Sequence, residues 1–139
     1  MAGAVWNPFV GETLLIPSGP LGDHLFFILL GPQKLPDHGG AEQFISVSVT
    51  TIYPGIPYDK SCVLDSGDHP FIKHPSYVTY RKYRIDPRDH VEQMVSAGLW
   101  KPHFPCNPDL IAKIKFMACD SKTMPKDVKA YLGCIPPAR

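Results

Sequence analysis

Strand-like patterns fill roughly the first 85 residues of the chain. Residues 11–16 and the continuous apolar run 24–30 predict two strands, the second buried on both faces because neither face is polar. Residues 44–52 alternate between apolar side chains and hydroxyls, and a short strand is predicted over residues 60–64. Residues 76–85 are dense in aromatic and β-branched residues, which favours another strand. Together these segments predict a β core of four or five short strands.

The hydrophobic period becomes helical after residue 85. Asp86-Pro87 and Asn107-Pro108 each combine an N-cap residue with proline at the first helical position. Apolar residues then recur at helical spacing, and Gly98 is a natural end for the first helix. A third short helix is predicted within residues 125–133.

This order of elements predicts one α+β domain over residues 1–139. The strands form a small, closed or nearly closed β-barrel over about residues 10–85, and the helical part covers about residues 86–133. We expect Trp6 and Trp100 to anchor the core or a lid, and residues 18–23 to form a turn-rich loop.

Composition narrows the class of protein. A length of 139 residues suits one hydrophobic core, and a net charge of +1 means that nucleic-acid binding would need a local basic patch. The longest apolar run is too short to span a bilayer, and the N-terminus does not resemble a secretory signal, so we expect a cytoplasmic protein without membrane contact. No two of the four cysteines form a C-x-x-C pair, which predicts four reduced thiols and neither a zinc site nor a disulfide framework.

Hydroxyl groups line one face of the strand predicted over residues 44–52. Ser46, Ser48 and Thr50, followed by Thr51, could position a phosphate or a ribose and assist transesterification. The alternative is that they occupy a solvated strand face.

Two carboxylates and two imidazoles cluster in the following loop. Asp65, Asp68, His69 and His74 could bind a divalent metal or supply acid–base groups, although their spacing matches no established metal motif. The alternative is a loop interrupted by His-Pro pairs.

Tyrosines and cations interleave along residues 77–84. Rings can stack on the bases of single-stranded RNA while cations meet its phosphates. Strict alternation places Arg81 on one face with Tyr77 and Tyr83, and Tyr80, Lys82 and Arg84 on the other, so only one set can face a ligand. The alternative is a strand with packed tyrosines and solvated charges.

The segment order resembles that of the MazF/PemK family of toxin endoribonucleases over about residues 11–118. Gly11-Glu12 stands where the family typically has a Gly-Asp start, and the segment 24–32 is similar to its Arg-Pro followed by an apolar strand. Residues 49–51 fall at its Thr-containing strand end, residues 76–85 at its later core strands, and residues 107–117 at its C-terminal helix.

The resemblance implies an SH3-like β-barrel, a homodimer, and metal-independent cleavage of single-stranded RNA without a cofactor. Thr50 matches the family threonine and Thr51 is its neighbouring alternative. The family arginine is unmatched: Leu25 holds its place, with His24 one residue earlier. We expect His24 to reach Thr50 only through a shifted register or a bulge, because consecutive strand residues point to opposite faces.

The leading hypothesis is therefore a MazF/PemK-like toxin that cleaves RNA and is paired with an antitoxin protein. Thr50, His24 and Thr51 are its candidate catalytic residues. The candidate RNA-binding residues are Ser48, Tyr80, Arg81, Lys82 and Arg84. The alternative is a non-catalytic module on the same barrel that binds nucleic acid or protein. A third hypothesis is a metal-dependent enzyme that uses Asp68, His69 and His74.

Overall fold

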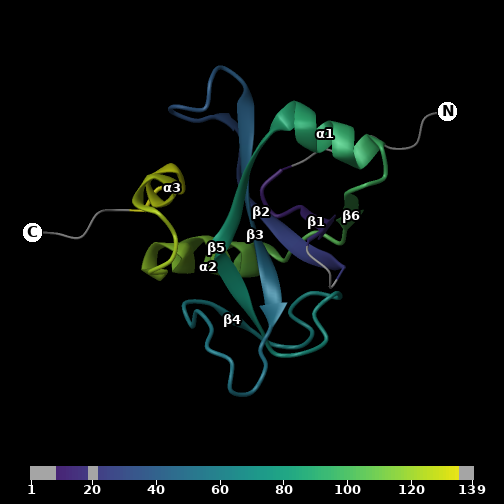
Figure 1. Cartoon of the computed structure of the whole chain (residues 1–139), viewed down its shortest axis with the longest axis vertical. Coiled ribbons are helices and arrows are strands. Elements are labelled where there is room, and N and C mark those ends of the chain that lie inside the picture. The colour runs from purple at the N-terminus through teal and green to yellow at the C-terminus, as the bar shows by residue number, and fades with distance from the viewer. Residues whose placement is uncertain (1–8, 19–21, 135–139) are drawn as a thin grey trace, which may run out of the picture.

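A computed structural model of the chain describes residues 9–18 and 22–134. Trp6 and the middle of the turn predicted over residues 18–23 lie outside the described residues. The architecture is α+β, as predicted, with one antiparallel sheet in the order β4-β5-β3-β2-β1-β6 (Figure 1). Its strands are β1 (Thr13–Pro17), β2 (Asp23–Lys34), β3 (Glu42–Thr51), β4 (Val63–Leu64), β5 (Ser76–Pro87) and β6 (Lys101–His103). The helical elements are α1 (Arg88–Ser96), α2 (Pro108–Met117), the 3-10 turn η1 (Ala118–Asp120) and α3 (Lys126–Tyr131).

Most of the predicted elements are confirmed, and the differences have local causes. Asn107 caps α2 as predicted, because its side chain accepts a hydrogen bond from the Asp109 backbone. Asp86 instead belongs to β5, and its carboxylate pairs with Arg84 rather than capping α1. The sequence pattern misses β6, since three residues with a central proline carry no alternation.

Two separate clusters of apolar side chains pack against the two faces of the sheet. Leu25, Phe27 and Leu29 of β2 point into the larger cluster, which α2, η1 and α3 cover. Phe26 and Ile28 point into the smaller cluster, which includes Val91 of α1 and Trp100. In Figure 1, α2 passes behind β5 and β3, so the viewer faces the side of the smaller cluster.

A bulge interrupts β5, so the side chains before and after it do not keep one regular alternation between the two faces of the sheet. Ser48 pairs with Thr79 and Ser46 pairs with Arg84, so one residue of β3 opposes the four residues 80–83 of β5. Thr79 and Arg84 therefore lie on the same face although five positions separate them. Tyr80 still follows Val78 into the larger cluster, so the strict alternation predicted for residues 77–84 is wrong only after Tyr80.

Hydrogen bonding does not close the described sheet into a barrel, because β4 and β6 are both edge strands. The loop after β4 nevertheless reaches the segment after β6. His69 Nε2 lies 2.6 Å from the Phe104 carbonyl oxygen, which also accepts from the Thr13 hydroxyl at 2.8 Å. Side-chain hydrogen bonds thus connect the two ends of the sheet.

The cysteines differ from their prediction. Cys119 and Cys134 form a disulfide that ties η1 to the residues after α3, so the prediction of four reduced thiols is wrong for this pair. The sequence pattern could not show this disulfide, because its two cysteines are 15 residues apart and meet only through the packing of η1, the following turn and α3. Cys62 and Cys106 are free and buried, and burial raises the pKa of Cys106 to about 11.

None of the helices within the described ranges is both long enough and apolar enough to cross a membrane.

Candidate functional site

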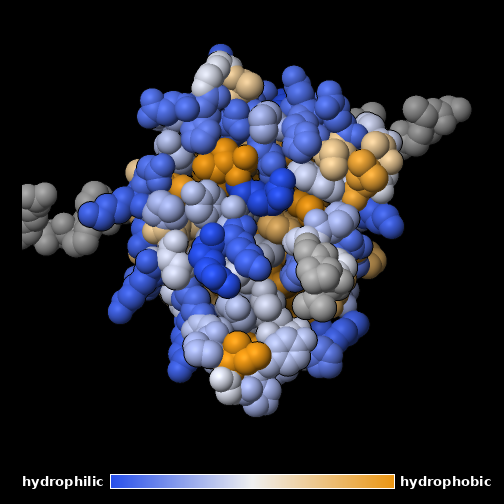
Figure 2. Space-filling model, in the orientation of Figure 1, coloured by the Kyte–Doolittle hydropathy of each residue, from blue (hydrophilic) through white to orange (hydrophobic). Residues whose placement is uncertain are grey.

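A hollow of about 240 Å³ opens on the face of the sheet that carries the smaller apolar cluster. Residues from β2, β3 and β5, with Ser18 at the end of β1, line it. The lining residues are Ser18, His24, Phe26, Ser48, Thr50, Lys82, Tyr83 and Arg84. Figure 2 views the molecule from this side and shows strongly hydrophilic side chains across the middle of the face. Five of the eight residues predicted for catalysis or RNA binding therefore meet in one place.

The strand register brings His24 level with Thr50. Phe26 pairs with Ser48, and His24 and Thr50 each lie two residues beyond this pair, so their side chains share its face of the sheet. Both side chains line the hollow, while Leu25 points into the larger core. The expectation that only a shifted register or a bulge could bring His24 to Thr50 is wrong. The regular register suffices, because His24 and Thr50 belong to the same alternate set of side chains.

A second hollow, of about 310 Å³, adjoins the first and shares His24 and Thr50 with it. Thr51 lines only this second hollow, together with Lys73 and His74 from the loop before β5. Two imidazoles and the threonine hydroxyl thus border two adjoining hollows, with Lys73 in the second and Lys82 and Arg84 in the first. We call the two hollows together the Thr50 groove.

Hydrogen bonds fix the hydroxyls and the imidazole at the centre of the groove. Thr50 Oγ1 lies 2.6 Å from the Thr79 hydroxyl, and His24 Nδ1 lies 3.1 Å from the Ser18 hydroxyl. His24 is half-buried, so its ring is held on one side by Ser18 while remaining accessible from the hollow. Such an imidazole can exchange protons through Nε2.

Arg84 is the cation of the groove that is held by the most contacts. Its Nε and Nη2 donate to the Asp86 carboxylate at 2.9 and 3.0 Å. Its guanidinium carbon lies 4.9 Å from the centre of the Trp100 ring and 6.0 Å from that of Phe26. Asp86 occupies two of the five N–H groups, and in the part of the chain that the structure describes no acceptor meets the others. Arg84 therefore presents free donors in a fixed orientation, as recognition of an anion requires.

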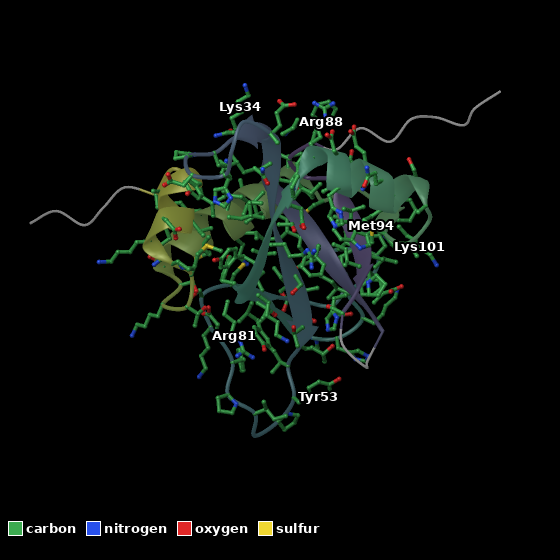
Figure 3. The ribbon with its side chains drawn as sticks, turned by 45° about the horizontal axis from the view of Figure 1, so that its top comes forward. Lys34, Tyr53, Arg81, Arg88, Met94 and Lys101 are labelled. Atoms are coloured by element: carbon green, nitrogen blue, oxygen red, sulfur yellow. A yellow bond between two sulfur atoms is a disulfide. The ribbon has the colours of Figure 1, made fainter. Side chains whose placement is uncertain are left out.

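The remaining predicted RNA-binding residues separate across β5. Lys82 is exposed and lines the groove. Tyr80 is fully buried, and its hydroxyl donates to the Ile114 carbonyl at 2.6 Å. The prediction that Tyr80 contacts RNA is therefore wrong, since its ring cannot meet a base. Arg81 lines a different cavity, and Figure 3 shows it in the same half of the molecule as Tyr53, far from Arg88, Met94 and Lys101 around α1.

The cluster predicted around His69 does not form a metal site. Phe71 N–H donates to His69 Nδ1 at 3.0 Å, so Nε2 carries the proton that is donated to Phe104. Burial lowers the pKa of His69, which keeps this ring neutral and occupied on both sides. Asp68 accepts from the Asp65 backbone, and within residues 9–18 and 22–134 no three metal-ligating side chains converge.

Several residues of the site were not predicted from the sequence, among them Ser18, whose hydroxyl contacts His24. Thr79 and Asp86 hold Thr50 and Arg84 through hydrogen bonds, and Trp100 stacks on the guanidinium. Thr79 was placed away from Arg84 only because the bulge was not visible. No local sequence signal connects Trp100 to Arg84, since the contact is tertiary.

Comparisons of the chain with protein-family models, with curated proteins and with solved structures find no match. The MazF/PemK resemblance therefore stays a prediction from the sequence.

Proposed function

We propose that this chain is a MazF/PemK-like toxin, a metal-independent endoribonuclease that cleaves single-stranded RNA at the Thr50 groove. The observation that carries the proposal is the convergence of His24, Thr50 and Arg84, from three neighbouring strands, on one hollow. An imidazole, a hydroxyl and a guanidinium are the groups that cleavage by the 2′-hydroxyl requires. Arg84 comes from β5 and would take the role of the family arginine, whose position in this chain is occupied by Leu25.

In the proposed reaction the scissile phosphate lies where the two hollows meet. The 2′-oxygen forms a bond to phosphorus while the bond from phosphorus to the 5′-oxygen breaks, which yields a 2′,3′-cyclic phosphate and a 5′-hydroxyl end. His24 accepts the proton of the 2′-hydroxyl. His74, which lines the second hollow together with His24, donates a proton to the departing 5′-oxygen.

The cations and hydroxyls act on the charge that develops at phosphorus. Arg84 donates to the non-bridging oxygens through the N–H groups that Asp86 leaves free, and Lys82 adds a second positive charge. Thr50 donates to the same oxygens, while Thr79 holds its hydroxyl in place. Thr51 borders the second hollow and serves to position RNA rather than to move protons.

Further parts of the proposal concern fold type, assembly and location. The six-stranded sheet, with its ends connected at His69 and Phe104, would be an open variant of the SH3-like barrel. By the same resemblance the toxin is a cytoplasmic homodimer that an antitoxin protein inhibits. In the cytoplasm Cys119 and Cys134 would be free thiols, because cellular thiols reduce most cytoplasmic disulfides. The bond ties elements on the face opposite the Thr50 groove.

Incubation of the purified protein with a long single-stranded RNA in excess EDTA tests the proposal. We expect cleavage products with 2′,3′-cyclic phosphate ends. Thr50→Val and His24→Gln should each lower the single-turnover rate at least about 100-fold. His38→Gln, which replaces a histidine outside the groove, is the matched control and should cleave like the unaltered protein.

Intact RNA across a range of sequences would overturn the nuclease proposal. RNA that is bound but not cleaved, with binding lost on Arg84→Glu and kept on Thr50→Val, would favour the alternative of a non-catalytic binding module. Cleavage that EDTA abolishes would contradict metal independence.

A further inference from the structure

A second cavity, of about 530 Å³, lies beside the Thr50 groove: Thr79, which contacts Thr50, is among its lining residues, although no residue lines both. Its walls are the segment Pro57–Ser61, the middle of β5, and the turn that follows η1. The two cavities are separated by the bulge of β5, where Arg81 lines one and its neighbour Lys82 lines the other.

One wall of this cavity is aromatic. The rings of Tyr58 and Tyr77 lie 5.2 Å apart at an interplanar angle of 36°, and both side chains are half-buried. The ammonium of Lys60 lies 5.7 Å from the centre of the Tyr58 ring. Half-buried tyrosine rings at the wall of an open cavity offer a stacking surface for another planar ring.

The charge around the aromatic wall is positive. Lys60, Arg81 and Lys122 line the cavity and are exposed, and no ion pair occupies them within the described residues. Asp120 supplies an opposing exposed carboxylate, and with Asp59 the lining holds three cations and two carboxylates, a net charge of +1.

Asp59 also lines the cavity and keeps its negative charge, but its oxygens are engaged internally rather than directed at a ligand. Its Oδ1 accepts from Ser61, and its Oδ2 accepts from Ser121 at 2.7 Å and from Thr123 at 3.3 Å. Desolvation by burial raises the pKa of Asp59, but these hydrogen bonds together outweigh it and leave the pKa below its usual value. Asp59 thus holds the loop 57–61 against the turn at Ser121, which gives the cavity fixed walls.

We propose that this cavity binds one nucleotide, with its base against Tyr58 and Tyr77 and its phosphate toward Arg81 and Lys122. A planar ring that carries an anion is the ligand chemistry that aromatic and cationic walls share. The nucleotide belongs to a single RNA strand that crosses the bulge from Lys82 to Arg81; a free mononucleotide has the same chemistry and is the other source. The assignment to an RNA strand rests on the proposed function, whereas binding of a mononucleotide does not require cleavage.

Titration with nucleoside 5′-monophosphates, followed by calorimetry or by amide shifts in NMR spectra, tests the site without any cleavage. We expect saturable binding by all four nucleotides and none by ribose 5-phosphate, which lacks the base. Tyr58→Leu and Arg81→Gln should each weaken binding about 5- to 100-fold. Phe116→Leu and Arg88→Gln, which alter an exposed ring and a cation elsewhere, are the matched controls and should bind like the unaltered protein.

Undetectable binding at millimolar nucleotide, or equal binding by Tyr58→Leu and the unaltered protein, would overturn the inference. Thr50→Val should bind mononucleotides normally, so failure of the nuclease proposal leaves this titration informative. Oligonucleotides with a single abasic position identify the source of the ligand. Weaker binding at one fixed abasic position supports an RNA strand, whereas no positional effect, with mononucleotide binding kept, supports a free nucleotide.

Discussion

At the scale of single residues, Arg84 is the side chain whose geometry is hardest to replace. Its guanidinium meets Asp86 through two N–H groups and lies over the Trp100 ring. A lysine keeps the positive charge but lacks the planar fork, so it cannot satisfy Asp86 and a phosphate in the same orientation. We therefore expect Arg84→Lys to lower the single-turnover cleavage rate roughly 100-fold while RNA affinity changes much less.

A loss of cleavage rate without an equal loss of RNA affinity would show that the guanidinium positions the phosphate rather than only attracting it. Arg88→Lys on α1 is the matched control, because Arg88 forms ion pairs with Glu42 and Glu92 outside the groove. Cleavage by Arg84→Lys at the unaltered rate would refute the role given to the guanidinium.

Tyr80 illustrates the opposite case, a polar group that serves the core. Its buried hydroxyl donates to the Ile114 carbonyl, and burial is the main reason that its pKa is raised. We expect Tyr80→Phe to lower the free energy of unfolding by about 1 kcal/mol, measured by urea denaturation, without a change in RNA binding. Tyr83→Phe, which alters a half-buried tyrosine of the same bulge, should change stability by less than about half of that amount.

Some residues of the groove were predictable and others were not. The hydroxyls of residues 46–51 predict a polar strand face, and Ser48 and Thr50 do line the groove. Asp86 was misread as a helix cap because Asp-Pro is a helix start in local terms. Its tertiary contact with Arg84 prevails over that local preference.

At the scale of elements, the disulfide controls how firmly α3 is held. α3 has only six residues, too few to be stable alone, and Cys134 ties its end to η1. A disulfide that closes a loop of this length contributes about 3 kcal/mol. We expect reduction, or Cys119→Ser with Cys134→Ser, to lower the Tm by roughly 10 °C.

The double serine variant also supplies the control for this experiment. It should show no further change in Tm on addition of a reductant. Proteolysis of the reduced protein and of the double serine variant should begin within residues 121–134. A Tm that reductant leaves unchanged in the unaltered protein would contradict the stabilising role of the bond.

Strand existence was predictable for β1, β2, β3 and β5, since hydrophobic periodicity decides it. The faces of β5 were not, because residues 80–83 contain no glycine or proline to mark the bulge. The disulfide was hidden for a related reason: the proximity of Cys119 and Cys134 depends on how the C-terminal helices pack.

At the scale of the whole molecule, His69 connects the two ends of the sheet. It is buried and neutral, with Phe71 donating to one ring nitrogen and Phe104 accepting from the other. Burial lowers its pKa in the folded protein, so the unfolded chain binds a proton more readily than the folded one. The stability due to neutral His69 is complete above the ordinary imidazole pKa of about 6.5 and declines as the pH falls below it.

We expect the free energy of unfolding to decrease between pH 7.5 and pH 5, by up to about 1.4 kcal/mol per pH unit within the affected range. Urea denaturation at several pH values measures this slope. His69→Gln should be less stable at neutral pH but should lose most of the acid-dependent decrease. His90→Gln, at an exposed histidine, should retain it, and an unchanged slope in His69→Gln would contradict the assignment.

The α+β class follows from segment order alone, whereas sheet closure does not. Closure depends on whether edge strands pair, and here the edges meet through His69 and Phe104 rather than through a ladder of backbone hydrogen bonds. Side-chain contacts between residues 35 positions apart leave no periodic trace in a sequence.

The bulge of β5 is a place where this chain can change in length over evolutionary time. Arg84 and Asp86 lie on the groove side because they pair with Ser46 and Phe44 of β3, whatever the number of residues before them. Four residues of β5 already oppose one residue of β3 there, so a residue gained or lost would leave these pairs in place. The length of this short segment can therefore vary while the ion pair of Arg84 and Asp86 keeps its face.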